Sequence, residues 1–162
     1  GGAPTRLQAS TRYISEQSGF DYYTPPKIEN NMGCKQMFTE GMGTIQKVYN
    51  GLDELLKKYG YERNGSYYKV LKESHDTIYL FCHFGVESVL LSHLFNCSPQ
   101  VVSHNFIALP TSVTTLISEE REQGKAYFRC QQFGDISHLY AAGEEPSFAG
   151  RWCECFSDPE RH

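Results

Sequence analysis

Residues 77–95 decide the fold class, and they read TIYLFCHFGVESVLLSHLF. The nearly unbroken apolar run over 77–82 predicts a strand buried on both faces, as in a parallel sheet covered by helices. Apolar residues then recur at helical spacing from Val86 to Phe95, which predicts a helix directly after a tight turn. A strand, a turn and a helix are half of a β-α-β unit. We therefore predict an α/β fold with a mostly parallel sheet flanked by helices on both faces.

A second helix is predicted before this unit. Apolar residues from Ile45 to Tyr59 recur at the three-and-four spacing of one helical face. Thr39 opens this helix, and Gly60 ends it as a left-handed cap residue. The preceding residues show no sustained period, so we expect an irregular N-terminal segment over residues 1–38.

The rest of the chain predicts one hairpin and three irregular regions. The β-rich runs over 112–117 and 126–130 predict two strands joined through the charged segment between them. We expect a polar link over 61–74 and an irregular stretch over 99–110, which Pro residues bracket. The Gly-, Glu- and Pro-rich tail over 134–162 is expected to wrap along the surface.

The composition limits the classes of protein to which the chain can belong. The 162 residues are 40% hydrophobic and 14% aromatic, which is enough for a packed core. The 15 basic and 19 acidic residues give a net charge of −4, which argues against binding to nucleic acid. No apolar run approaches the roughly 18 residues of a membrane span. We therefore expect neither a nucleic-acid partner nor a membrane.

The six cysteines indicate a compartment. An even cysteine count could form a disulfide framework in a short secreted chain. This chain is longer and more apolar, and residues 1–10 do not resemble a secretory signal. We therefore favour free buried thiols and a cytoplasmic location. Cys153 and Cys155 lack a second pair at zinc-finger spacing, so we expect no metal and no cofactor.

The best candidate site is the turn between the strand over 77–82 and the following helix. In open α/β sheets, ligands bind beyond the carboxyl ends of the strands, which is where His83 lies. Backbone N–H groups at the start of the helix favour an anion such as phosphate. Gly85 allows close approach of the backbone. The alternative is a histidine that is hydrogen-bonded within the core.

Three segments carry a resemblance to a known family. Residues 81–94, FCHFGVESVLLSHL, resemble the second-histidine segment of the histidine phosphatase superfamily, also called phosphoglycerate mutase-like. Residues 109–116, LPTSVTTL, resemble that family's strand after the long helix-and-loop connection. Residues 133–139, FGDISHL, resemble its closing segment. Their order and spacing match the family, and the resemblance covers roughly residues 40–150.

The resemblance implies a phosphomonoester phosphatase that works through a phosphohistidine. His83 matches the family's second histidine, which donates to the phosphoryl oxygens in the transition state. Thr111 and Ser112 would lie near the phosphate and His138 at the rim, although a purely structural role is the alternative for all three. The partner would be a phosphorylated small molecule or inorganic phosphate, and no metal is needed.

The sequence also departs from the family. It contains no Arg-His-Gly triplet, which carries the family's nucleophile, and its Arg161-His162 pair follows a polar segment. Residues 39–162 therefore resemble the C-terminal portion of the domain without its N-terminal part. We expect an unpaired sheet edge and, through it, a homo-oligomer. The alternative function is a noncatalytic α/β anion-binding or interaction module derived from the family.

We predict that this chain does not hydrolyse p-nitrophenyl phosphate, because no residue matches the histidine that would carry the phosphoryl group. A steady-state assay of the purified chain measures this. Clear turnover that His83→Ala abolishes would contradict the prediction.

Overall fold

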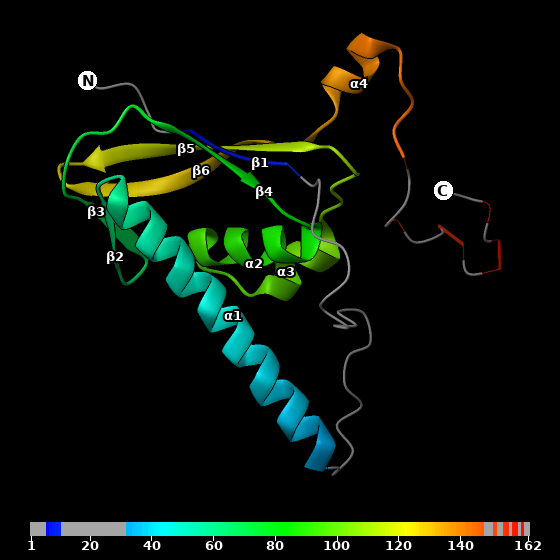
Figure 1. Ribbon diagram of the computed structural model, residues 1–162, viewed down its shortest axis with the longest axis horizontal. Coiled ribbons are helices and arrows are strands. Elements are labelled where there is room, and N and C mark those ends of the chain that lie inside the picture. The colour runs from blue at the N-terminus through cyan, green and yellow to red at the C-terminus, as the bar shows by residue number, and fades with distance from the viewer. Residues whose placement is uncertain are drawn as a thin grey trace.

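The structure is a computed structural model that describes residues 6–10 and 32–42 by their backbone, residues 43–147 in full, and the single residues Arg151, Glu154, Cys155, Ser157, Asp158 and Glu160. Its elements are, in chain order, β1 (Arg6–Ser10), α1 (Met32–Lys58), β2 (Tyr61–Asn64), β3 (Tyr67–Val70), β4 (Thr77–Phe81), α2 (Phe84–Phe95), α3 (Pro99–Asn105), β5 (Val113–Glu122), β6 (Lys125–Asp135) and α4 (Ser137–Ala142). Figure 1 shows a mixed α/β arrangement of one sheet and packed helices.

The sheet is mostly antiparallel, so the prediction of a mostly parallel sheet is wrong. The strand order is β2-β3-β6-β5-β1-β4, and only β1 and β4 pair in parallel. All other pairs are antiparallel: β2–β3 and β5–β6 are hairpins, β3 pairs with β6, and β1 pairs with β5. Hairpins need only short turns, whereas parallel pairs need crossover connections.

The error came from the apolar run over 77–82. In β4 the side chains alternate between two environments, as expected for period-2 geometry. Ile78 packs in the core, whereas Tyr79 and Phe81 are 62% and 63% exposed on the opposite face. The run is therefore apolar on both faces without being buried on both. Among the described strands β4 is also an edge strand, so the expected homo-oligomer through this edge stays a prediction.

The helices α1, α2 and α3 lie on one face of the sheet, and no described helix covers the other face (Figure 1). This corrects the expectation of helices on both faces. The core lies between the helices and the sheet, and its buried residues come from α1, α2, α3 and the strands β2 to β6. Its buried members include Leu52, Leu56, Ile78, Leu91, Leu94, Val102, Leu116 and Phe128.

Several elements form where the sequence predicted none. Strand β1 and the start of α1 fall inside the segment 1–38, which was expected to be irregular. The polar link is the hairpin β2–β3, and the irregular stretch after Pro99 begins with α3. The predicted hairpin β5–β6 forms, and its strands also take up most of the charged segment. Tertiary pairing supplies partners that local propensity does not reveal.

Gly60 ends α1 as the sequence predicts. Its φ of +95° is a left-handed conformation that glycine adopts without strain. Its carbonyl accepts the N–H of Leu71 at 2.7 Å, which brings the end of β3 back to the helix. A Cβ atom at this position would lie 2.6 Å from Cγ and 2.7 Å from the carbonyl oxygen of Lys72. Both the conformation and the close approach therefore require glycine.

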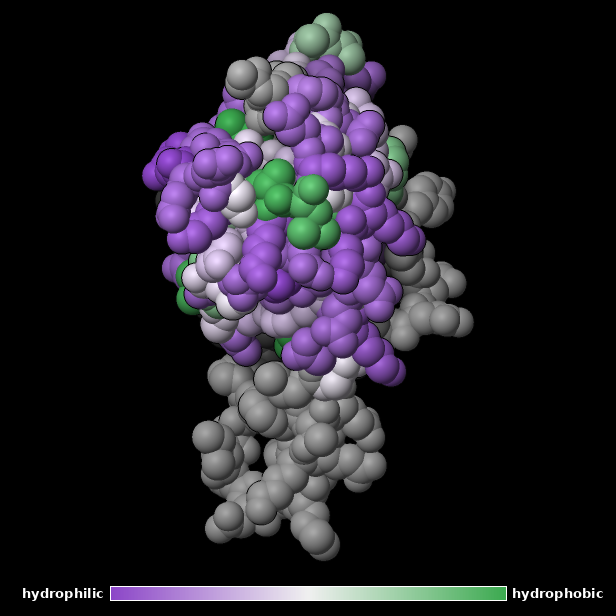
Figure 2. Space-filling model, turned by 90° about the vertical axis from the view of Figure 1, so that its left-hand side faces the viewer, coloured by the Kyte–Doolittle hydropathy of each residue, from purple (hydrophilic) through white to green (hydrophobic). Residues whose placement is uncertain are grey.

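The face of the sheet without a described helix is polar where β5 and β6 pair. Glu119 of β5 accepts from Arg129 of β6 at 2.8 Å and from Arg121 at 3.2 Å. The end of the molecule on the left of Figure 1 is also largely hydrophilic, with one small apolar patch, as Figure 2 shows. Solvent can therefore cover these surfaces without a large penalty.

We predict that Leu56→Ala lowers the free energy of unfolding by about 2–5 kcal/mol, because Leu56 is fully buried between α1 and the sheet. Urea denaturation followed by circular dichroism measures the change. Leu71→Ala is the matched control, since Leu71 is exposed, and we expect it to change stability by less than about 0.5 kcal/mol. Equal losses in the two variants would contradict the packing described above.

Candidate functional site

The residues predicted from the sequence to form the phosphate site lie near one end of the sheet. Ser10 of β1 pairs with Phe81 at the end of β4 and with Val113 at the start of β5. Val113 also pairs with Asp135 at the end of β6. These four positions form one row across the sheet, and we call this part of the molecule the site end. The proposed residues all lie within a few positions of this row: His83, Gly85, Thr111, Ser112 and His138.

Helix α2 begins at the site end and presents its N-terminus there. His83 is the N-cap residue, with φ −78° and ψ 156°, and its carbonyl accepts the N–H of Glu87 at 2.9 Å. Its side chain is exposed and makes no capping hydrogen bond. The first-turn N–H groups of an α-helix have no acceptor within the helix, and they carry partial positive charge. Gly85 lies in this first turn. The arrangement can bind an anion.

The segment before β5 contacts the segment after β6. Thr111 Oγ1 lies 3.2 Å from His138 Nε2, so the structure brings these two proposed residues together. Thr111 has a left-handed backbone, with φ +67°, in the turn where Ser112 N–H donates to the Leu109 carbonyl. Because β4 and β5 are separated only by β1, the start of β5 lies about 10 Å from the end of β4. A ligand of modest size can span that distance.

Ser112 differs from the other proposed residues because it is buried. Its side chain is 1% exposed, and its hydroxyl has no hydrogen-bond partner among the described residues. Thr114, two positions later in β5, is also 1% exposed. Ser112 therefore lies beneath the site end rather than on its surface.

A buried carboxyl group, which the sequence analysis missed, also lies beneath the site end. Glu87 of α2 is 1% exposed, and neither carboxyl oxygen has a hydrogen-bond partner among the described residues. Burial raises the pKa of Glu87, and the nearby Thr114 hydroxyl opposes the shift only in part. A glutamate in the first turn of a helix is common, so the sequence carried no signal of its burial.

The thiol that precedes His83 is not a nucleophile at neutral pH. Burial, together with the nearby Glu87, raises the pKa of Cys82 to about 12. Four cysteines have described side chains, and all four are free, but only Cys82 is buried. The expectation of buried thiols therefore holds for one of them, while Cys34 and Cys153 lie outside the described side chains.

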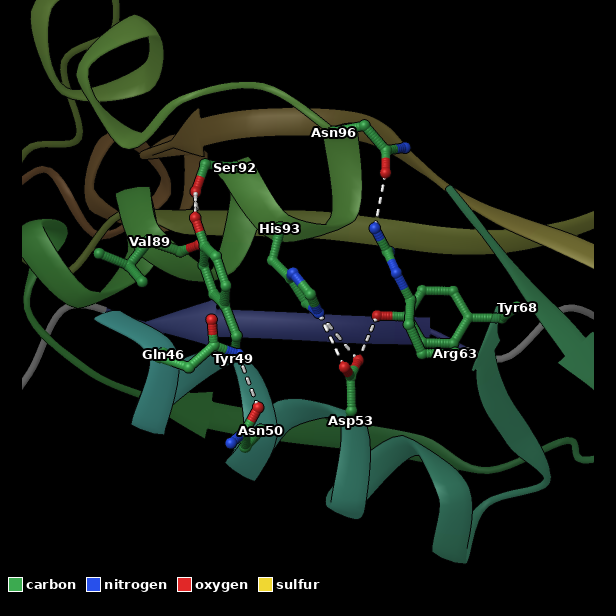
Figure 3. Close-up of polar contacts among 10 residues, drawn as sticks. All are labelled: Gln46, Tyr49, Asn50, Asp53, Arg63, Tyr68, Val89, Ser92, His93 and Asn96. Atoms are coloured by element: carbon green, nitrogen blue, oxygen red, sulfur yellow. Dashed lines mark hydrogen bonds and ion pairs between the residues drawn. The ribbon is translucent and has the colours of Figure 1, made fainter. Parts of the chain in front are cut away.

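A second polar cluster, drawn in Figure 3, joins α1 to α2 and β3. The Asp53 carboxylate accepts a hydrogen bond of 2.8 Å from the Tyr68 hydroxyl, and its oxygens lie 2.9 and 3.0 Å from His93 Nε2. The ring of Tyr49 stacks on His93 with centroids 4.2 Å apart. The side chain of His93 is only 13% exposed. The sequence could not reveal this contact, which joins residues 40 positions apart.

This cluster does not form a Ser-His-Asp triad. Ser92 donates its single hydroxyl proton to the Val89 carbonyl at 2.7 Å. The Tyr49 hydroxyl, 3.0 Å away, must therefore donate to Ser92 Oγ. Ser92 thus faces Tyr49 rather than His93, and the imidazole nitrogen Nε2 of His93 contacts the Asp53 carboxylate instead (Figure 3). The cluster holds α1 against α2.

No protein-family model, curated protein or solved structure matches the chain. The described residues hold no group of three or more His, Cys, Asp or Glu side chains that could bind a metal ion. No helix in the described part has the length and apolarity to cross a membrane. What the site end does is therefore inferred from its own residues.

We predict that Glu87→Gln makes the protein more stable than wild type as pH rises. The raised pKa means that folded Glu87 retains a proton that the unfolded chain loses above about pH 4.3. Wild-type stability therefore falls as pH rises above that value, until the folded carboxyl also ionises. The amide side chain of the variant does not titrate. Urea denaturation at several pH values between 4 and 8 measures the difference.

The matched control for this prediction is Glu54→Gln, which changes an exposed glutamate of α1. We expect its stability to follow the wild-type pH profile. A constant difference between Glu87→Gln and wild type across this pH range would show that the buried carboxyl does not hold its proton.

Proposed function

We propose that the site end binds the phosphate group of a phosphomonoester and that His83 donates to the phosphoryl oxygens. The observation that carries the proposal is the position of His83, which lies two residues after the end of β4 and occupies the N-cap position of α2. A phosphate there would meet an imidazole, backbone N–H groups and the positive end of a helix dipole. These are the groups that stabilise the charge of a transferring phosphoryl group.

For an intact domain that includes an Arg-His-Gly segment, the proposed activity is that of a phosphomonoester phosphatase resembling the histidine phosphatases. The 162 residues lack that segment, so they are expected to bind phosphate without turnover. Each of the three segments with that resemblance contains one residue of the row at the site end, namely Phe81, Val113 or Asp135, which supports a shared role. The finer proposal of a phosphoglycerate mutase-like fold rests on these segments and on the β4–α2 unit. The largely antiparallel sheet does not add to it.

A second proposal is a noncatalytic anion-binding module. It is favoured by the lack of an Arg-His-Gly triplet in the 162 residues and by the raised pKa of Cys82, the thiol nearest to His83 in the sequence. In this case the site end would bind phosphate without forming a phosphohistidine. The two proposals share the anion site and differ in turnover.

We predict that inorganic phosphate shifts the amide resonances of residues 84–86 in ¹H–¹⁵N NMR spectra. His83→Ala should weaken this binding about tenfold or more, because it removes a hydrogen bond to a charged group. His75→Ala is the matched control, since His75 is an exposed histidine at the opposite end of β4. It should leave the affinity unchanged. Saturating millimolar phosphate that shifts none of these resonances would refute the anion site.

A further inference from the structure

Three aromatic side chains pack together next to His83. Phe84 at the start of α2, Phe106 after α3 and Phe133 near the end of β6 form one cluster, which we call the aromatic wall. The ring centroids are 6.3 Å apart for Phe84 and Phe133 and 5.0 Å apart for Phe106 and Phe133. The wall thus joins three segments that are distant in sequence. Phe84 follows His83 directly, so the wall begins at the proposed phosphate site.

Part of the aromatic wall faces solvent. Phe106 is 44% exposed, and the adjacent Ile107 is 58% exposed. Binding sites for small organic molecules are lined mainly by apolar and aromatic side chains, with a few polar groups that fix the orientation of the ligand. The polar groups here are the N-terminal N–H groups of α2, which favour an anion. The site end therefore offers donors for a negative charge and an apolar surface beside them.

The aromatic wall is held in place by backbone contacts. The N–H of Phe106 donates to the Val102 carbonyl at 3.1 Å and so caps α3. Gly134 has φ +62°, and a Cβ atom there would lie 3.2 Å from the Ile107 carbonyl oxygen. This close approach keeps the segment after α3 against β6. A ligand would find the wall largely preorganised, which lowers the entropic cost of binding.

We propose that the aromatic wall binds the organic group of the ligand, and that this ligand is a phosphate monoester of an aromatic alcohol. The inference rests on the proposed phosphate site. A phosphate at the start of α2 places its ester oxygen next to Phe84, from which the wall extends to Phe106 and Ile107. An aromatic ring would stack on or pack edge-on to these side chains. An extended lipid surface fits less well, because the exposed apolar area here consists of Phe106 and the adjacent Ile107.

The test compares three ligands by NMR titration of the wild-type chain: phenyl phosphate, glycerol 1-phosphate and inorganic phosphate. We expect phenyl phosphate to bind about two- to tenfold more tightly than the other two ligands, because one contact between aromatic rings increases affinity by about that factor. Phe106→Ala should abolish this preference and leave the affinity for inorganic phosphate unchanged. Phe95→Ala is the matched control, because Phe95 is 36% exposed at the other end of α2, and it should keep the preference.

The outcomes separate the inference from the function on which it rests. If none of the three ligands binds, both the phosphate site and the wall's role fail. If inorganic phosphate binds and phenyl phosphate binds no more tightly, only the inference fails. Ile107→Ala provides a second test should Phe106→Ala lower the urea midpoint, and it should also reduce the preference. Stronger binding to phosphatidic acid vesicles than to phenyl phosphate would also overturn the inference.

Discussion

The burial of one face of the sheet beneath α1 and α2 is the constraint on which the structure depends. Leu56 of α1, Leu91 of α2 and Phe128 of β6 belong to a single core cluster. The gain from burying such side chains scales with the apolar area removed from water. Because the core lies on one face, the other face of the sheet is left without a described helix. It carries the Glu119–Arg129 ion pair, which suits solvent, and also the exposed Tyr79 and Phe81.

This one-sided core also determines where polar groups become buried. Asp53 lies on the side of α1 that faces α2 and β3. There its carboxylate accepts a hydrogen bond from Tyr68 and contacts His93 (Figure 3). Glu87 is buried beneath the site end, and this burial raises its pKa. Neither of its carboxyl oxygens has a hydrogen-bond partner among the described residues. A satisfied buried network stabilises a fold, whereas an unsatisfied group costs free energy. The two carboxyl groups thus have opposite consequences for stability.

The site end combines two kinds of surface. The start of α2 offers N–H donors and His83, and the aromatic wall continues from Phe84. Both depend on the row of paired residues from Phe81 to Asp135, because that row brings the ends of four strands to one edge. Binding of a phosphate monoester, as proposed, would use both surfaces at once.

The sequence by itself determined the local elements whose signals are short-range. The apolar periodicity of α1 and α2, the strand over 77–81, the hairpin β5–β6 and the stop at Gly60 all follow from patterns within a few residues. It also placed His83 between a strand and a helix. Only the tertiary structure decided that the sheet is antiparallel, that Tyr79 faces solvent, and that Asp53 meets His93. These features depend on which distant segments pair, and a local pattern of apolar residues does not specify the partner.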